Sequence, residues 1–132
     1  MIRAVVFDYG GVIFDNLHWH HEMFALARDL KAKGYKVALL SNMIPPLAWV
    51  TNHLPSTKIF DPVVISADVG HSKPHPEIYN ILLERIGLPA EDCLFMDDRP
   101  ENIATATSLG LQTKLVVHPK ITAKEIRQEL GL

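Results

Sequence analysis

Six polar residues that could together act on a phosphate ester are spread along the chain, most of them directly after a short apolar run. They are Asp8, Ser41, Asn42, Lys73, Asp97 and Asp98. A carboxylate can act as a nucleophile, a hydroxyl and an amide can bind phosphate oxygens, a lysine can neutralise them, and further carboxylates can hold a divalent cation. Taken singly, such residues after a strand often just cap a turn or a helix. Taken together, the set is typical of phosphoryl transfer.

The apolar runs before these residues predict β-strands, because each run is too short and too apolar for an amphipathic helix. The predicted strands cover residues 4–7, 36–40, 62–65, 93–96 and 113–117. Strands that lack polar alternation are buried on both faces, which is typical of a parallel sheet. The carboxyl ends of parallel strands meet at one edge of the sheet, where ligands bind. We therefore expect the six polar residues to gather near that edge.

Segments of helical periodicity separate the strands and predict crossover helices. These helices lie within residues 23–34, 45–54, 78–87 and 100–110. A last helix is expected to begin at Thr122, because Thr122 and Glu125 have the spacing of a capping box. Strands that alternate with helices predict an α/β fold. We expect one domain over residues 1–132, with three layers around a doubly wound, five-stranded parallel sheet.

Composition favours a cytoplasmic protein without a nucleic-acid partner. The chain has 13 Lys and Arg against 15 Asp and Glu, so it lacks the basic excess that contacts a nucleic-acid backbone. Its single cysteine, Cys93, lies in an apolar run, so no disulfide is expected within the chain. The apolar run before Asp8 is too short for the core of a signal peptide or for a membrane span. We therefore expect a soluble protein in a reducing compartment, with no membrane partner.

Four segments of the chain resemble the four motifs of the haloacid dehalogenase superfamily, in the same order and at similar spacing. They are Phe7-Asp8-Tyr9-Gly10-Gly11-Val12, Leu40-Ser41-Asn42, Ser72-Lys73-Pro74 and Phe95-Met96-Asp97-Asp98. The resemblance runs from the first predicted strand to Gly110 and so covers most of the chain. It implies a Rossmann-like core and a phosphatase that needs Mg²⁺.

The resemblance also implies how the phosphoryl group is handled. Asp8 would attack phosphorus and become an aspartyl phosphate, which water then hydrolyses. Lys73 would relieve the repulsion between this carboxylate and the phosphate anion and would bind the phosphate. Ser41 would donate its hydroxyl to the phosphoryl group, with help from Asn42 and from backbone amides of the first loop, including that of Gly11.

The metal site implied by the resemblance uses the Asp8 carboxylate, the Gly10 carbonyl and an acidic residue of the fourth motif. Either Asp97 or Asp98 could fill the last position. We favour Asp98, because Asn102 then falls at the family's downstream polar position. Asp97 and Asn102 would support the metal ligands from behind.

A first departure from the family pattern concerns the general acid and base. The family's phosphatases usually carry a second Asp two residues after the nucleophile, and Gly10 stands there instead. Loss of such a group typically costs about a hundredfold to ten-thousandfold in rate. Asp15, His18, His20 and His21 lie just downstream and are candidate replacements. These histidines lack the Cys or acidic neighbours of a zinc site, so we do not expect them to bind a metal.

A second departure concerns the helical cap domain that this subgroup usually inserts after the first motif, for which we see no room. Residues 65–93 also have room for only one loop and one helix. An open site favours a bulky phosphorylated substrate or a lid from a second subunit of a homo-oligomer, with Trp19 and Trp49 as candidate contacts. The sequence leaves two alternatives. One is a weakly active core that binds a phosphorylated ligand or a protein partner. The other is a carbon–halogen hydrolase, which would not need the acidic metal ligands.

Overall fold

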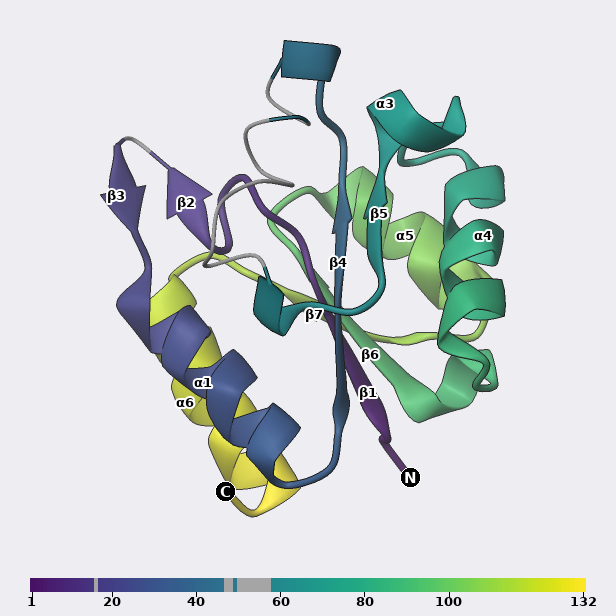
Figure 1. The fold of residues 1–132 in the computed structure, drawn as a ribbon. Coiled ribbons are helices and arrows are strands. Elements are labelled where there is room, and N and C mark those ends of the chain that lie inside the picture. Colours follow the sequence, from purple (N-terminus) through teal and green to yellow (C-terminus); the bar gives the residue numbers. More distant parts are fainter. Residues whose placement is uncertain (16, 47–48, 50–57) are drawn as a thin grey trace.

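The computed structural model describes residues 1–15, 17–46, 49 and 58–132. Its centre is a five-stranded parallel sheet with the strand order β5-β4-β1-β6-β7 (Figure 1). The strands are β1 (Ala4–Phe7), β4 (Lys36–Ser41), β5 (Val63–Ile65), β6 (Cys93–Asp97) and β7 (Gln112–Leu115). The predicted sheet is confirmed, with small shifts at the strand ends.

Helices cover both faces of the sheet, which confirms the three-layer prediction. They are α1 (His21–Ala32), α3 (Ser66–Val69), α4 (Pro76–Ile86), α5 (Pro100–Ser108) and α6 (Pro119–Leu130), with a short 3-10 turn at Ala90–Asp92. Figure 1 shows α1 and α6 together on one face and α4 and α5 on the other. None of the helices in the described part of the chain is long and apolar enough to cross a membrane.

The central strand β1 is completely buried because its residues alternate between two apolar cores. Val5 and Phe7 pack in the core that contains the buried side of α1 and α6. Ala4 and Val6 pack in the core that contains the buried side of α4 and Ala106 of α5. This arrangement holds β1 between β4 and β6, so the three carboxyl ends of these strands lie side by side.

The last helix begins earlier than predicted. Helix α6 starts at Pro119, and the backbone N–H of Thr122 donates to the carbonyl of His118 at 3.0 Å. Thr122 is therefore inside the first turn, where its side chain is buried, and it does not cap the helix. Proline fixes φ at a helical value and loses nothing at the first helical position, so Pro119 explains the early start.

A short antiparallel hairpin lies between the first motif and helix α1, and no pattern in the sequence predicts it. It consists of β2 (Phe14–Asp15) and β3 (His18–Trp19). Aromatic contacts hold it: the ring centroids of Trp19 lie 4.7 Å from Phe14, 6.1 Å from Tyr9 and 5.7 Å from Phe24. The predicted helix over residues 45–54 falls largely outside the described residues.

Candidate active site

The six polar residues singled out in the sequence lie at or beside the carboxyl ends of β1, β4 and β6. Asp8 follows β1, Ser41 ends β4, Asp97 ends β6, and Lys73 precedes α4. A pocket of about 690 Å³ opens over these strand ends. Its lining residues are Asp8, Gly10, Gly11, Ser41, Asn42, Lys73, Pro74, Asp98, Arg99, Glu101 and Asn102. The fold therefore brings the predicted residues together, with Asp97 directly beneath the pocket.

Lys73 is buried at the floor of the pocket and ties the strand ends together. Its ammonium donates to Asp8 Oδ1 at 2.8 Å, to Asp97 Oδ2 at 2.7 Å and to the carbonyl of Leu40 at 2.9 Å. An ammonium has three N–H groups, so these acceptors use all of them. The side chain is 1% exposed. In this arrangement Lys73 neutralises the two carboxylates and orients them, and all three of its N–H groups are in use. Its direct contact with phosphate stays a prediction.

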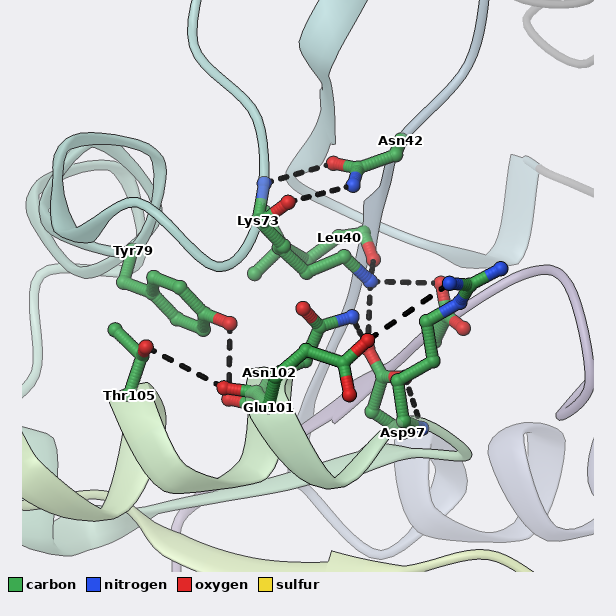
Figure 2. Close-up of polar contacts among 10 residues, drawn as sticks. Leu40, Asn42, Lys73, Tyr79, Asp97, Glu101, Asn102 and Thr105 are labelled. Carbon is green, nitrogen blue, oxygen red and sulfur yellow. Dashed lines mark hydrogen bonds and ion pairs between the residues drawn. The ribbon is translucent and has the colours of Figure 1, made fainter.

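Asp97 is fully buried, and both of its carboxylate oxygens are occupied. Oδ2 accepts hydrogen bonds from Lys73 and from Asn102 Nδ2 at 3.0 Å, while Oδ1 accepts one from the backbone N–H of Arg99 at 2.9 Å (Figure 2). The Tyr79 hydroxyl donates to the carbonyl of Asn102 at 2.9 Å, which connects α4 to the first turn of α5. Asp97 and Asn102 therefore lie in a supporting layer, in keeping with the choice of Asp98 as the outer carboxylate.

Gly11 and Asp98 are in close contact, and the contact depends on the absence of a side chain at Gly11. A Cβ built on Gly11 would lie 2.2 Å from Asp98 Oδ2, and the residue has φ +80°. The backbone N–H of Gly11 donates to the carbonyl of Phe14 at 3.0 Å. This hydrogen bond closes the turn after β1, and phosphate binding by this amide stays a prediction. Gly11 also makes room for the Asp98 carboxylate.

Three carboxylates converge at the pocket and could hold a metal ion. Asp8, Asp97 and Asp98 each offer an oxygen, and these oxygens all lie within 4.8 Å of one another. The neighbouring carbonyl of Gly10 accepts no hydrogen bond from any residue that the structure describes. Carboxylate and carbonyl oxygens are the protein ligands that Mg²⁺ prefers. The residues present therefore fit this ion.

The electrostatics of the site favour a bound cation. The pKa of Asp8 is raised to about 7, mainly by burial; the nearby Asp97 and Asp98 carboxylates contribute to the rise, and Lys73 opposes it. Partial burial and then the Asp97 carboxyl raise the pKa of Asp98 as well. One ammonium thus shares the site with three carboxyl groups. A divalent cation would relieve the excess negative charge and favour the ionised form of Asp8.

Asn42 holds the loop that carries Lys73. Its side-chain amide donates to the Lys73 carbonyl at 2.9 Å, and its side-chain oxygen accepts from the Lys73 backbone N–H at 2.9 Å. This reciprocal pair was not expected, and it leaves one N–H of Asn42 for a ligand. The hydroxyl group of Ser41, predicted to bind phosphate, belongs to a residue that lines the pocket.

The predicted substitutes for the missing general acid do not join the pocket lining in the described part of the chain. His18 is exposed in β3, His20 precedes α1 and lies 3.6 Å from Glu22, and His21 begins α1. The side chain of Asp15 lies outside the described residues. The geometry therefore brings none of the three histidines to the strand ends.

Comparisons with known proteins place the chain in a family. Residues 25–110 match the family described as haloacid dehalogenase-like hydrolase. The matched segment includes Lys73, Asp97 and Asp98 but begins after Asp8. Acyl-CoA dehydrogenase family member 10 of Mus musculus is 37% identical over 104 residues, which cover 78% of this chain and 10% of the mouse protein. The glyceraldehyde 3-phosphate phosphatase of Methanothermobacter thermautotrophicus is 32% identical over 119 residues, which cover 81% of this chain and 52% of the archaeal protein. The chain thus spans about half or less of the length of these relatives.

Two solved structures resemble this fold. An uncharacterised protein from Corynebacterium glutamicum matches with a TM-score of 0.87 and 25% identity, covering 100% of this chain and 97% of the other. A HAD family enzyme from Bacteroides thetaiotaomicron, solved in complex with magnesium and inorganic phosphate, matches with a TM-score of 0.60 and 25% identity, covering 72% of this chain and 50% of the other. Fold, motifs and the match over residues 25–110 agree, and the chain belongs to the haloacid dehalogenase-like hydrolase family.

Proposed function

We propose that this chain is a Mg²⁺-dependent phosphatase that hydrolyses a phosphate monoester through an aspartyl phosphate on Asp8. One observation carries the proposal: the carboxylates of Asp8, Asp97 and Asp98 converge over a buried ammonium at the floor of a pocket. A site so rich in carboxylates repels an anionic substrate unless a cation is present. With a divalent cation, the same groups suit phosphoryl transfer.

The proposed magnesium ligands are the Asp8 carboxylate, the Gly10 carbonyl and the Asp98 carboxylate. The bound ion would offset the charge of the phosphate and keep Asp8 ionised. Gly11 supports this set because its missing side chain lets Asp98 approach the first loop. The magnesium and phosphate complex of the Bacteroides enzyme also supports it, as a property of a related fold.

In the proposed reaction a carboxylate oxygen of Asp8 attacks phosphorus, and the bond between phosphorus and the ester oxygen breaks. The departing oxygen takes up a proton and leaves as an alcohol. Water then attacks phosphorus, which releases inorganic phosphate and restores the carboxylate. Lys73 fixes Asp8 Oδ1 throughout, so the nucleophile is held in place before substrate arrives. Ser41 and the remaining N–H of Asn42 are the proposed donors to phosphate oxygens.

We also propose that the catalytic core works without a cap domain. Residues 8–20 connect β1 to α1 and hold the small hairpin, and residues 66–92 connect β5 to β6 and hold α3 and α4. An open pocket suits a bulky phosphorylated substrate or a lid from a second copy of the chain. A cytoplasmic location would fit the buried, unpaired Cys93.

The proposal is tested by phosphate release from 4-nitrophenyl phosphate with and without Mg²⁺. We expect turnover that requires Mg²⁺ and disappears in an Asp8→Asn variant. An Asp29→Asn variant is the matched control, because Asp29 pairs with Arg127 on the far helical face and lines no part of the pocket. Equal turnover by Asp8→Asn and the unchanged protein would refute the role of Asp8 as the nucleophile. Equal turnover with and without Mg²⁺ would refute the requirement for the metal.

A binding function is the second candidate, and Gly10 is the observation that favours it. The family's usual acid is absent at Gly10, and the three nearby histidines lie away from the pocket lining. A core of this kind would hold a phosphorylated ligand without rapid turnover. Absence of turnover together with Mg²⁺-dependent binding of inorganic phosphate would favour this function over the phosphatase.

A further inference from the structure

Arg99 lines the pocket of the candidate active site, but it has no role in the phosphatase reaction proposed above. It follows Asp98 directly and precedes Pro100, the first residue of α5. Its backbone N–H donates to Asp97 Oδ1 at 2.9 Å, so the base of its side chain is fixed to the end of β6. The side chain itself is 70% exposed. Arg99 therefore combines an anchored backbone with a guanidinium group that can reorient.

Arg99 is the pocket cation that can offer hydrogen bonds to a substrate. The described lining residues include two cations, Lys73 and Arg99. In this structure Lys73 donates its three N–H groups to Asp8, Asp97 and the Leu40 carbonyl. A guanidinium group carries five N–H donors in a fork that matches a carboxylate or a phosphate. An anion that enters this pocket thus finds its available side-chain cation at Arg99.

The present partner of Arg99 is easily replaced. Its Nη1 atom lies 3.8 Å from Glu101 Oε1, and the Glu101 side chain is 54% exposed. Exposed ion pairs of this kind contribute little to stability because water and salt screen them. A substrate anion could therefore take the place of Glu101 without loss of a strong contact.

The position of Arg99 separates it from the reacting phosphoryl group. Asp8 and Lys73, at the floor, are 9% and 1% exposed, whereas Arg99 is mostly exposed at the rim. We propose that Arg99 binds a second anionic group in the leaving part of the substrate, a carboxylate or a further phosphate a few bonds from the scissile ester. The inference rests on the proposed phosphatase function and narrows its substrate class.

The test uses two esters that differ in one group, 3-phosphoglycerate with a carboxylate and glycerol 3-phosphate with a hydroxymethyl group. We expect kcat/KM to favour the carboxylate ester by about tenfold or more, because charge-assisted hydrogen bonds are strong. An Arg99→Ala variant should lose this preference, mainly through KM. An Arg85→Ala variant, at the far end of α4, should keep it. A Glu101→Gln variant should lower KM for the carboxylate ester.

A parallel binding measurement separates this inference from the proposed reaction. In the Asp8→Asn variant with Mg²⁺, calorimetry should show tighter binding of 3-phosphoglycerate than of glycerol 3-phosphate, and Arg99→Ala should remove the difference. If this difference in binding is seen but the unchanged protein shows no turnover, the phosphatase proposal is refuted and the proposed anion site is supported. Equal affinity for the two esters, no binding of either, or an equal loss for both in Arg99→Ala would overturn the anion site.

Discussion

The close contact between Gly11 and Asp98 makes Gly11→Ala a direct test of the proposed metal site. The added Cβ would lie 2.2 Å from Asp98 Oδ2, whereas a Cβ atom in a protein essentially never lies closer than 3.0 Å to another heavy atom. The carboxylate must therefore move by about 0.8 Å or more. Asp98 is exposed to solvent and can swing outward, so the chain should still fold.

The expected cost has two parts that separate variants can measure. An L side chain at φ +80° costs about 1–2 kcal/mol of stability. Displacement of Asp98 should weaken Mg²⁺ binding by about tenfold to a hundredfold, the loss typical when a metal site loses its supporting geometry. Gly34→Ala measures the first part alone, since Gly34 has φ +95° and open space around it. Gly10→Ala changes the neighbouring residue without strain or contact.

The assays are urea unfolding for stability and isothermal titration calorimetry for Mg²⁺ affinity. Gly34→Ala and Gly11→Ala should lose similar stability, while only Gly11→Ala should lose metal affinity. Gly10→Ala should bind Mg²⁺ as the unchanged protein does, because the ligand there is a carbonyl. If Gly11→Ala binds Mg²⁺ with unchanged affinity, Asp98 is not a ligand and the reasoning fails.

Three further predictions concern charge and the missing acid. Native Asp8 has a raised pKa of about 7 against 3.8 in its ordinary state; without Mg²⁺, its contribution to stability is therefore fully present below about pH 4 and is lost as the pH rises through 7. The loss reaches up to about 4 kcal/mol, and a urea-unfolding series in which Asp8→Asn keeps the full slope would contradict it. Lys73→Met should cost about 3–5 kcal/mol at pH 8 because it leaves two buried carboxylates without a cation; an unfolding midpoint unchanged from that of the parent would count against the role of Lys73. Gly10→Asp should raise turnover of alkyl phosphates by about a hundredfold if the missing acid limits the rate, since a side chain at Gly10 meets open space; unchanged kcat would show that another group supplies the proton.

The sequence predicts the framework of this protein well because its strands are short, apolar and separated by strong helix signals. The run from Ala4 to Phe7 is buried on both faces, as its lack of polar alternation indicates. Asp8, Ser41 and Asp97 could be placed at one edge of the sheet because parallel strands put their carboxyl ends together. These inferences need only local pattern and topology.

What the sequence does not predict depends on side chains that meet across the fold. The β2–β3 hairpin has two residues in each strand and is held by rings from other segments, such as Tyr9 and Phe24. No sequence pattern shows that the Lys73 ammonium uses all three N–H groups, or that the Asn42 side chain forms two hydrogen bonds with the Lys73 backbone. Nor does a sequence pattern show that the backbone N–H of Gly11 donates to the Phe14 carbonyl within a turn. Such pairings depend on differences in interatomic distance of a few tenths of an ångström.

The strand order has a consequence for how the chain is made. Strand β1 precedes the other strands of the sheet in the chain but lies in the middle of the sheet, and its register with β6 pairs Ala4 with Cys93. A nascent chain that stops before β6 leaves one side of β1 unpaired and the Lys73 ammonium without Asp97. Such distant pairings slow folding because long loops must close first. Asp8 is thus synthesised well before Asp97, and its surroundings are completed only after β6 has emerged.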